Sequence, residues 1–282
     1  MDFHYQAPFN IIGNIFYVGT KFVSSHLFTS PKGHVLIDAG MPKDGATILE
    51  NIEKLGFRGR DIRYLLITHA HIDHLGGAAH VVKETGASAC IGEADVPIAE
   101  HGRIERYDRF GNKTKIDISS KVMARKKQYL MNFEAIEIVR RIKDGEHLKI
   151  DTTVIEFFHT PGHTAGSFGF GFQVESNGTK YNGFLPGGIG AIVFRDNFIK
   201  DNISGANVNA YIDSLKRMQK MDVDVWLGAH PFFNNTLEKW ERLRKGNSNA
   251  NPFIDPEGGK VFLCHWLKEA ENVLSRLKRV GK

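Results

Sequence analysis

The sequence predicts an α/β fold, and three observations favour this class. The chain has 282 residues, 41% of them hydrophobic, which is enough for one large domain with a substantial core. Short apolar runs typical of strands alternate with segments whose apolar residues recur at helical spacing. Near residue 70 a strand runs into a histidine-rich loop, a helix and another strand, as in an α/β unit. No linker or repeat interrupts this order, so we expect a single domain over 1–282, built of two similar halves, roughly 1–150 and 151–282.

The first half begins with short strands and then alternates helices and strands. Apolar runs separated by turn residues predict a β-meander within residues 14–40. Apolar residues at helical spacing before a glycine predict a helix over 44–57. A buried strand is expected at 62–68, followed, beyond the histidine loop, by a helix at 77–87 and a strand at 88–92.

The second half repeats this logic after a stretch, residues 101–145, whose structure is hard to assign. That stretch is polar and basic, and we expect it to contain either a helix near 131–142 or an irregular surface segment. The elements expected beyond it are strands at 153–159 and 168–174, a hairpin at 178–188, a helix at 208–221, a strand at 223–229 and a helix at 260–279. The last helix carries an amphipathic stripe, so it is expected to pack on the core.

Composition limits the possible partners. The net charge of +5 comes partly from basic runs without interleaved aromatic residues, so we expect no nucleic-acid partner. No stretch reaches the roughly 20 apolar residues of a membrane span. The chain as it stands is expected in the cytoplasm, or in the periplasm or outside the cell if a signal peptide was removed; both a monomer and a homo-oligomer are compatible with it. Cys90 and Cys264 match no metal or redox spacing and are interpreted as buried free thiols.

The stretch "THAHIDHLGG", residues 68–77, indicates a metal site. It contains four potential ligands within six positions, and two later loops that follow strands each add a histidine. These six candidates are His69, His71, Asp73, His74, His163 and His230. A catalytic zinc binds about three protein ligands and leaves a position open, so six ligands fit two zinc ions. Side chains two apart in an extended loop face the same way, so His69 and His71 are expected on one ion.

Other polar residues near these loops are interpreted as structural. We expect His26 at the surface, with the edge of the cleft as its alternative place. His80 is expected to be exposed on the helix after the cluster, and His159 to be a packing residue. Local hydrogen bonding is the expected role of Thr68 and Thr164.

The motif HxHxDH at 69–74, the later "HTPGHTAGS" at 159–167 and "GAH" at 228–230 resemble the metallo-β-lactamase superfamily. The stretches "PFNIIGNIFYVGT", "HVLIDAGMP", "DIRYLLITHAHIDHLGG" and "GHTAGS" are similar, in order and spacing, to class B, subclass 3 metallo-β-lactamases. This resemblance spans nearly the whole chain. It implies an αββα sandwich of four layers with two Zn²⁺ ions.

The resemblance also implies a ligand set. It assigns one zinc to His69, His71 and His163, and the other to Asp73, His74 and His230. Much of the superfamily, including glyoxalase II and the lactonases, adds a bridging aspartate from a hairpin that reads "GFLPGGIG" here, without aspartate, cysteine or histidine. Asp196 lies further along the chain and is interpreted as too distant to replace it.

The missing carboxylate favours the subclass 3 arrangement, and further positions bear on the substrate. Subclass 3 enzymes commonly carry serines in this hairpin and a tyrosine before them, where this chain has Gly187, Gly188 and Phe184. Asp38 is a candidate to accept a hydrogen bond from a ligand imidazole, and capping the turn at Gly40 is its alternative role. The segment from Asp117 to Glu134 is expected to form a rim over the zinc ions.

These expectations lead to a zinc-dependent β-lactamase, an enzyme of antibiotic resistance that opens the β-lactam ring of a small substrate. Two zinc ions would generate a hydroxide at neutral pH, and Asp73 would orient it and handle its proton. One alternative is a hydrolase of the same fold that acts on another ester, lactone or thioester, with weak β-lactamase activity. Another is a protein that uses the metal for structure or binding only, which three ligands per ion argue against.

Overall fold

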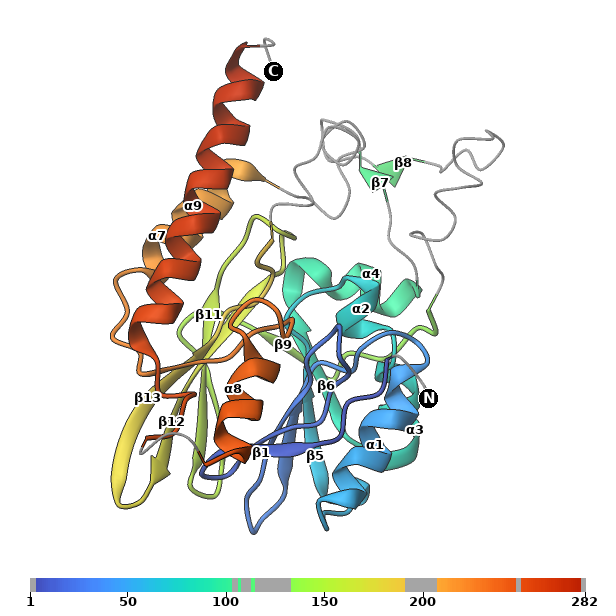
Figure 1. Cartoon of the computed structure of the whole chain (residues 1–282). Coiled ribbons are helices and arrows are strands. Elements are labelled where there is room, and N and C mark those ends of the chain that lie inside the picture. Colours follow the sequence, from blue (N-terminus) through green and yellow to red (C-terminus); the bar gives the residue numbers. More distant parts are fainter. Residues whose placement is uncertain are drawn as a thin grey trace.

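Two β-sheets pack face to face, and helices cover both outer faces, as Figure 1 shows. The computed structural model describes residues 4–102, 106–107, 113–114, 133–190, 207–246 and 250–279. This is the αββα sandwich that the resemblance implied, and it confirms the predicted fold class. Within the described residues, no helix combines the length and apolar character needed to cross a membrane.

The first sheet is formed mainly by the first half of the chain. Its strand order, within the described residues, is β1-β2-β3-β4-β5-β6-β9. The strands are β1 (Phe9–Ile12), β2 (Ile15–Tyr17), β3 (His26–Phe28), β4 (His34–Ile37), β5 (Ile62–Leu66), β6 (Ser88–Gly92) and β9 (Arg140–Ile142). Strands β1 to β4 pair antiparallel, which confirms the predicted meander, and β4, β5, β6 and β9 pair parallel.

The second sheet follows the order β10-β11-β12-β13-β14. Its strands are β10 (His147–Ile150), β11 (Thr153–His159), β12 (Phe168–Ser176), β13 (Thr179–Leu185) and β14 (Val225–Trp226). Strands β10 to β13 are antiparallel, and β14 joins β13 in parallel. A separate pair, β7 (Arg106–Tyr107) and β8 (Lys113–Thr114), lies outside both sheets.

Helices form the outer layers and the loop edge. Figure 1 shows α1 and α3 on the side of the first sheet and α7 and α9 on the side of the second. The helices are α1 (Asp44–Lys54), α2 (Ile72–Leu75), α3 (Ala78–Thr85), α4 (Val96–His101), α7 (Val208–Met218), α8 (Thr236–Arg244) and α9 (Pro256–Arg279), with 3-10 turns at η1 (Gly59–Asp61) and η2 (Glu93–Asp95). The apolar stripes predicted for α7 and α9 face the core.

Three buried clusters fill the three interfaces between the four layers. Successive residues of a strand point to opposite faces, so each sheet supplies two cores. In β5, for example, Leu66 packs between the sheets and Leu65 packs under α1 and α3. In β13, Leu185 faces the other sheet and Phe184 lies under α7 and α9. Each such side chain contributes roughly 1.5–3 kcal/mol when fully buried.

Several expectations were wrong in detail. A helix does not form over the described part of 131–142, because Ile136 and Ile138 are buried while Glu137 between them is exposed, and this period of two suits extended chain that leads into β9. Strand β10 lies in the second sheet, so the chain passes between sheets at residues 143–146 instead of near 150. The predicted hairpin 178–188 is a single strand, β13, which forms its hairpin with β12. Cys90 is buried as expected, but Cys264 is exposed on α9.

Candidate metal centre

Four loops that follow strands meet at one edge of the sandwich. The carboxyl ends of parallel strands share an edge, so loops that leave them face a common crevice. Asp38 follows β4, the histidine cluster follows β5, and His163 and His230 lie in the loops after β11 and β14. Each of the six predicted ligands comes from this edge.

The first group of potential ligands consists of His69, His71 and His163. Their ligand atoms lie within 4.8 Å of one another. Nε2 of His69 is 3.1 Å from Nδ1 of His71. Two imidazole ligands of one tetrahedral zinc lie about 3.3 Å apart, given Zn–N distances of about 2.0–2.1 Å. The pair therefore has the spacing of two ligands of one ion, and His163 completes the group from the other sheet.

The second group consists of Asp73, His74 and His230, again within 4.8 Å of one another. Oδ2 of Asp73 lies 3.5 Å from Nε2 of His74 and 3.5 Å from Nε2 of His230. Helix α2 begins at Ile72, immediately after the extended residue His71, and this change of backbone direction turns Asp73 and His74 away from the first group. The imidazoles of His69 and His74 are 4.3 Å apart between centroids, so the two groups are neighbours.

In three of the candidate ligands, the ring nitrogen that faces away from the group is hydrogen-bonded, as in metal-binding histidines. Nδ1 of His74 lies 2.8 Å from Oδ2 of Asp38, Nδ1 of His163 lies 3.0 Å from the Gly190 carbonyl, and Nδ1 of His230 lies 2.7 Å from the Phe22 carbonyl. Each of these nitrogens donates its hydrogen, which leaves Nε2 as a lone-pair donor that points into its group. The residues present therefore fit two ions such as zinc.

Burial and mutual repulsion favour the ligand forms of His69, His71 and His163. The pKa of His74 is instead raised, because the lowering by its burial is outweighed by the carboxylates of Asp73 and Asp38. Burial lowers the pKa of His69 and of His163 well below the usual range, and neighbouring imidazoles add to the effect. The pKa of His71 falls to about 4 for the same first reason. Desolvation would raise the pKa of Asp73, but His74 and His230 outweigh it and lower this pKa to about 2. Neutral imidazoles and an ionised carboxylate are the species that bind metals.

Asp38 lies directly against the second group. Its carboxylate, 1% exposed, accepts hydrogen bonds from the Thr68 N–H (2.8 Å), the Thr68 hydroxyl (2.8 Å) and the ring of His74 (2.8 Å). Of the two roles weighed from the sequence, contact with a candidate ligand is the one that the structure contains. Thr68 makes one local contact, from its hydroxyl to Nδ1 of His69 at 3.0 Å, but its two bonds to Asp38 join positions 30 apart, so the predicted local role holds only in part.

Asp95 is the residue that sequence reasoning missed. It ends the η2 turn after β6, is 1% exposed, and accepts hydrogen bonds from the Ala70 N–H, the Thr164 hydroxyl and the Gly166 N–H. Burial raises its pKa, and these hydrogen bonds oppose the rise. The available signal was its position, since it follows a parallel strand at the same edge as the histidine loops.

The hairpin residues singled out for substrate contact divide into two cases. Phe184 is 1% exposed and packs under α7 and α9 beside Phe158 and Trp226, so it does not face the metal centre. Gly187 and Gly188 do lie at the centre, where a Cβ on Gly187 would overlap the Phe168 carbonyl and one on Gly188 would lie 2.9 Å from Cβ of His163. The backbone is therefore too close here for serine at either position. Asp196, and residues 117–132 of the expected rim, lie outside the described residues, and Phe133 of that segment is buried in the core.

The remaining histidines are not part of either group. His159 packs against Phe168 at 5.0 Å between ring centroids and its Nε2 lies 2.9 Å from the Ala165 carbonyl, so it is a packing residue as predicted. His80 is half-buried on α3 instead of fully exposed. His26 was wrongly placed at the surface: it is 1% exposed and lies on the same face of β3 as Phe28, which packs in the core between the sheets.

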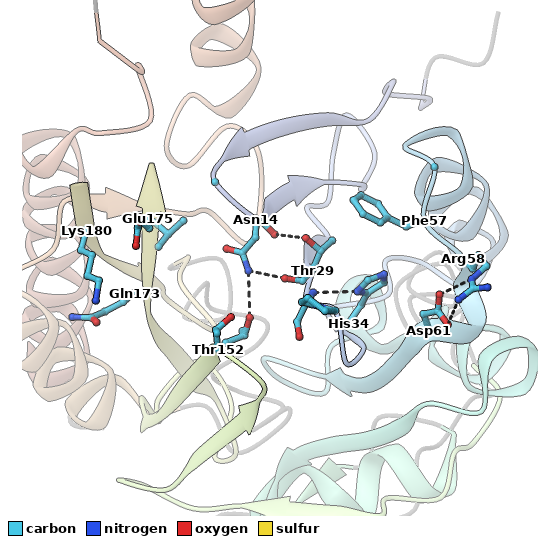
Figure 2. Close-up of a pocket in the computed structure, with 16 residues that line it drawn as sticks. Asn14, Thr29, His34, Phe57, Arg58, Asp61, Thr152, Gln173, Glu175 and Lys180 are labelled. Atoms are coloured by element: carbon cyan, nitrogen blue, oxygen red, sulfur yellow. Dashed lines mark hydrogen bonds and ion pairs between the residues drawn. The ribbon is translucent and has the colours of Figure 1, made fainter. Parts of the chain in front are cut away.

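A large cavity at the opposite edge of the sandwich is unrelated to the metal centre. Figure 2 shows this space of about 960 Å³, lined by residues that include Asn14, Thr29 and His34. His34 is the first residue of β4, whereas Asp38 follows its last residue. The length of the strand therefore separates the cavity from the candidate metal ligands. Its charged lining is partly paired, as in the 2.7 Å bond from Arg58 to Asp61.

Solved metallo-β-lactamases resemble this chain over its full length. FEZ-1 from Legionella gormanii is 27% identical with a TM-score of 0.81, and the match covers 98% of both chains. BJP-1 of Bradyrhizobium japonicum, a subclass B3 enzyme, is 27% identical with a TM-score of 0.82 and covers 99% of this chain and 98% of its own. These neighbours confirm the resemblance to subclass 3.

Curated relatives are more varied. The β-lactamase-like protein 2 homolog of Caenorhabditis elegans is 25% identical over 84% of this chain, and the match spans 62% of that protein's length. Hydroxyacylglutathione hydrolase GloC of Haemophilus influenzae is 26% identical over 60% of this chain and 70% of its own. A family model described as "Metallo-beta-lactamase superfamily" matches residues 18–176, a stretch that holds five of the six converging side chains. With the fold, the two ligand groups and this match in agreement, the chain belongs to the metallo-β-lactamase superfamily.

Proposed function

We propose that this protein is a zinc-dependent β-lactamase with a binuclear metal site. The observation that carries the proposal is the pair of adjacent three-residue groups, His69, His71 and His163 beside Asp73, His74 and His230. Structural zinc sites are closed by four protein ligands, whereas three ligands leave a position for water or substrate. Similarity to subclass B3 enzymes over almost the whole chain supports the β-lactam substrate.

The six side chains would hold two zinc ions, which when bound supply Lewis acidity toward a carbonyl and an activated water. The protein's own groups orient this site. Asp38, Gly190 and Phe22 accept the hydrogens of three imidazoles and so fix the direction of each Nε2. The side chain of Asp73 is 32% exposed, so an approaching water can reach it, and its ionised carboxylate can accept a hydrogen bond that orients this water.

A β-lactam assay combined with metal analysis tests the proposal. Zinc-loaded protein is expected to bind two equivalents of zinc and to hydrolyse a chromogenic cephalosporin and a carbapenem. The matched control is the His71→Ala variant, which lacks one ligand of the first group. A wild-type rate no higher than the rate of this variant, in protein shown to contain two zinc ions, would reject β-lactamase activity.

A second candidate is a hydrolase of the same site that acts on a thioester, another ester or a lactone. Two observations favour it: the relative named as a hydroxyacylglutathione hydrolase, and the glycines that replace the serines expected near the substrate. An acylglutathione thioester and a set of lactones, assayed beside the β-lactams, distinguish the two. Turnover of the β-lactams alone would exclude this candidate, and zinc binding without turnover of any substrate would favour a purely structural or binding role.

A further inference from the structure

Asp95 joins the two loops that supply the first ligand group. Ala70, whose N–H lies 2.8 Å from Oδ2 of Asp95, stands between His69 and His71 in the sequence. Thr164, whose hydroxyl donates to the same oxygen at 2.7 Å, directly follows His163. The Gly166 N–H donates to Oδ1 at 2.9 Å. One carboxylate therefore binds a loop of the first sheet and a loop of the second.

The fit around this carboxylate is close. A Cβ on Gly166 would lie 2.5 Å from Cγ of Asp95, so the loop approaches to a distance that only glycine permits. The Thr164 hydroxyl also lies 2.8 Å from Oγ of Ser167, which receives the Thr164 N–H at 3.1 Å. The hydrogen bonds thus reach the backbone on both sides of the first group, and no ion pair with a lysine or arginine is found for Asp95 in the part of the chain that the structure describes.

The chemistry calls for an ionised carboxylate in particular. All three partners are donors, and a carboxylate is an acceptor at both oxygens. An asparagine of the same shape would turn an NH₂ group toward at least one N–H or O–H donor, and at a site that is 1% exposed water cannot compensate. The Asp95→Asn variant therefore keeps the volume of the side chain and loses at least one of the three hydrogen bonds.

We propose that Asp95 is a positioning residue for the first metal ion: it fixes the His69–His71 loop against the His163 loop and so sets the separation of the three imidazoles. The inference rests on the proposed ligand assignment. Among the described residues, Asp95 makes no hydrogen bond to Asp73, to His74 or to the loop of His230, so we expect its effect at the first group.

Zinc titration of single-site proteins tests this confinement without any substrate. His230→Ala breaks the second group and leaves the first, and His163→Ala does the reverse. Zinc affinity is measured by competition with a chromophoric chelator, with and without Asp95→Asn in each background. We expect about tenfold weaker binding in the His230→Ala background, within the range seen when the partners of metal ligands are removed, and unchanged binding in the His163→Ala background.

Two further variants make the result specific. Asp144→Asn is the matched control, because Asp144 also accepts a backbone N–H, that of His159 at 2.7 Å, but at the end of β11, and no hydrogen bond to a candidate ligand is found for it among the described residues. Asp144→Asn is expected to leave zinc affinity unchanged in both the His230→Ala and the His163→Ala background. Thr164→Val removes one of the three donors to Asp95. It is expected to weaken zinc binding at the first group as well, by a smaller factor than Asp95→Asn. If thermal unfolding shows that metal-free Asp95→Asn is not folded, Thr164→Val decides the test.

Each outcome has a defined meaning. Loss of affinity in both backgrounds, or in neither, overturns the positioning role of Asp95. If the His230→Ala protein with Asp95 intact binds no zinc, the proposed ligand assignment itself is contradicted. Weaker zinc binding at the first group in a protein without β-lactamase activity leaves the inference standing and removes only the proposed substrate.

Discussion

Asp38 shows how one residue at the end of a strand connects the sheet to the metal centre. It adopts a left-handed backbone conformation, with φ of 60°, directly after β4. Aspartate tolerates this region better than most residues because its short polar side chain can hydrogen-bond locally. From there its carboxylate reaches both Thr68 and His74. The turn after β4 is thus shaped to deliver an acceptor to the imidazole of a candidate ligand.

The Asp38→Asn variant should weaken zinc binding at the second group. Asparagine also tolerates the left-handed region, but its NH₂ group would face the donors of Thr68 or His74. We expect roughly 10–100-fold weaker zinc binding at the second group, measured by chelator competition in the His163→Ala background. Asp61→Asn is the control, since the ion pair that the described residues give to Asp61 is with neighbouring Arg58 near the surface. Unchanged affinity in Asp38→Asn would show that the ring of His74 is fixed by other contacts.

His26 gives the protein a predicted sensitivity to acid. Burial lowers its pKa from 6.5 to about 3, and its Nε2 has no partner among the described residues. Below pH 6.5 the unfolded chain takes up a proton at this residue while the folded protein does not, so stability falls as pH decreases from 6.5 toward 3. At pH 5.5 the loss relative to pH 7.5 is about 1.4 kcal/mol.

Replacing this histidine by leucine should remove that loss. For metal-free protein unfolded in denaturant, the free energy of unfolding of His26→Leu, relative to wild type, is expected to rise by about 1.4 kcal/mol between pH 7.5 and 5.5. The other histidines are common to both proteins and cancel in this difference. Leucine at exposed His147 serves as the control and should leave the difference unchanged. A flat difference for His26→Leu would mean that His26 is protonated in the folded state.

The residues of the candidate site differed in how far the sequence could predict them. The six candidate ligands were found because their spacing within one loop and their positions after strands are local features. Asp95 was missed because its partners are 25 to 71 positions away, which no local pattern reports. His26 was misplaced because histidine is usually assigned to the surface, although its position two residues before Phe28 puts both side chains on the core face of β3.

At the scale of elements, the turn from the histidine loop into α3 depends on close packing at Gly77. A Cβ there would overlap the Ala39 carbonyl and lie 2.8 Å from the Gly45 nitrogen. The Ala39 N–H in turn donates to the His74 carbonyl at 2.8 Å. The start of α3, the turn after β4 and the second ligand group are therefore one packed unit.

A pair of glycine variants tests this unit. Gly77→Ala should cost roughly 1–3 kcal/mol by overpacking and, by displacing Ala39, should also weaken zinc binding at the second group. Gly86→Ala is the matched control. Gly86 ends the same helix with φ of 71°, and no atom of the described residues lies within 4 Å of where its Cβ would be, so alanine costs roughly 1–2 kcal/mol by backbone strain alone. Both variants lower the unfolding midpoint, but only Gly77→Ala is expected to change zinc affinity. Equal affinities in the two would separate the packing of α3 from the metal centre.

Elements were predicted where periodicity and boundaries agreed. The helices α1, α3, α7 and α9 and the strands β5, β6 and β11 carry clear periods and end at glycines or at polar loops. Residues 133–142 were misread because a short apolar run with glutamates fits a helix as well as a strand, and only the partners in the core decide. The pairing of β10 with β11 across a tight turn is likewise set by tertiary contacts, since each strand alone is ambiguous.

At the scale of the whole molecule, the two sheets depend on each other. The core between them is built from both, with Phe28, Ile37 and Leu66 from the first sheet against Phe157, Phe170 and Leu185 from the second. Periodicity shows that each strand has a buried face but not which sheet it meets, so the four-layer arrangement came from the resemblance. That the whole chain acts as a single domain remains a prediction that this shared core supports.

Metal removal should therefore weaken the association of the two sheets. Each group draws ligands from both: His69 and His71 follow β5 while His163 follows β11, and Asp73 and His74 follow β5 while His230 follows β14. Ions that bind only the folded protein stabilise it by RT ln(1 + [L]/Kd), about 2.7 kcal/mol per site at a free concentration 100 times Kd. Chelation by EDTA is thus expected to lower the unfolding midpoint, and returning zinc should restore it. A His163→Ala, His230→Ala double variant, which retains every ligand of the first sheet and none of the second, should show almost no response to EDTA. If its midpoint fell as far as that of the wild type, the ions would be held within one sheet, and the linkage between the halves would not exist.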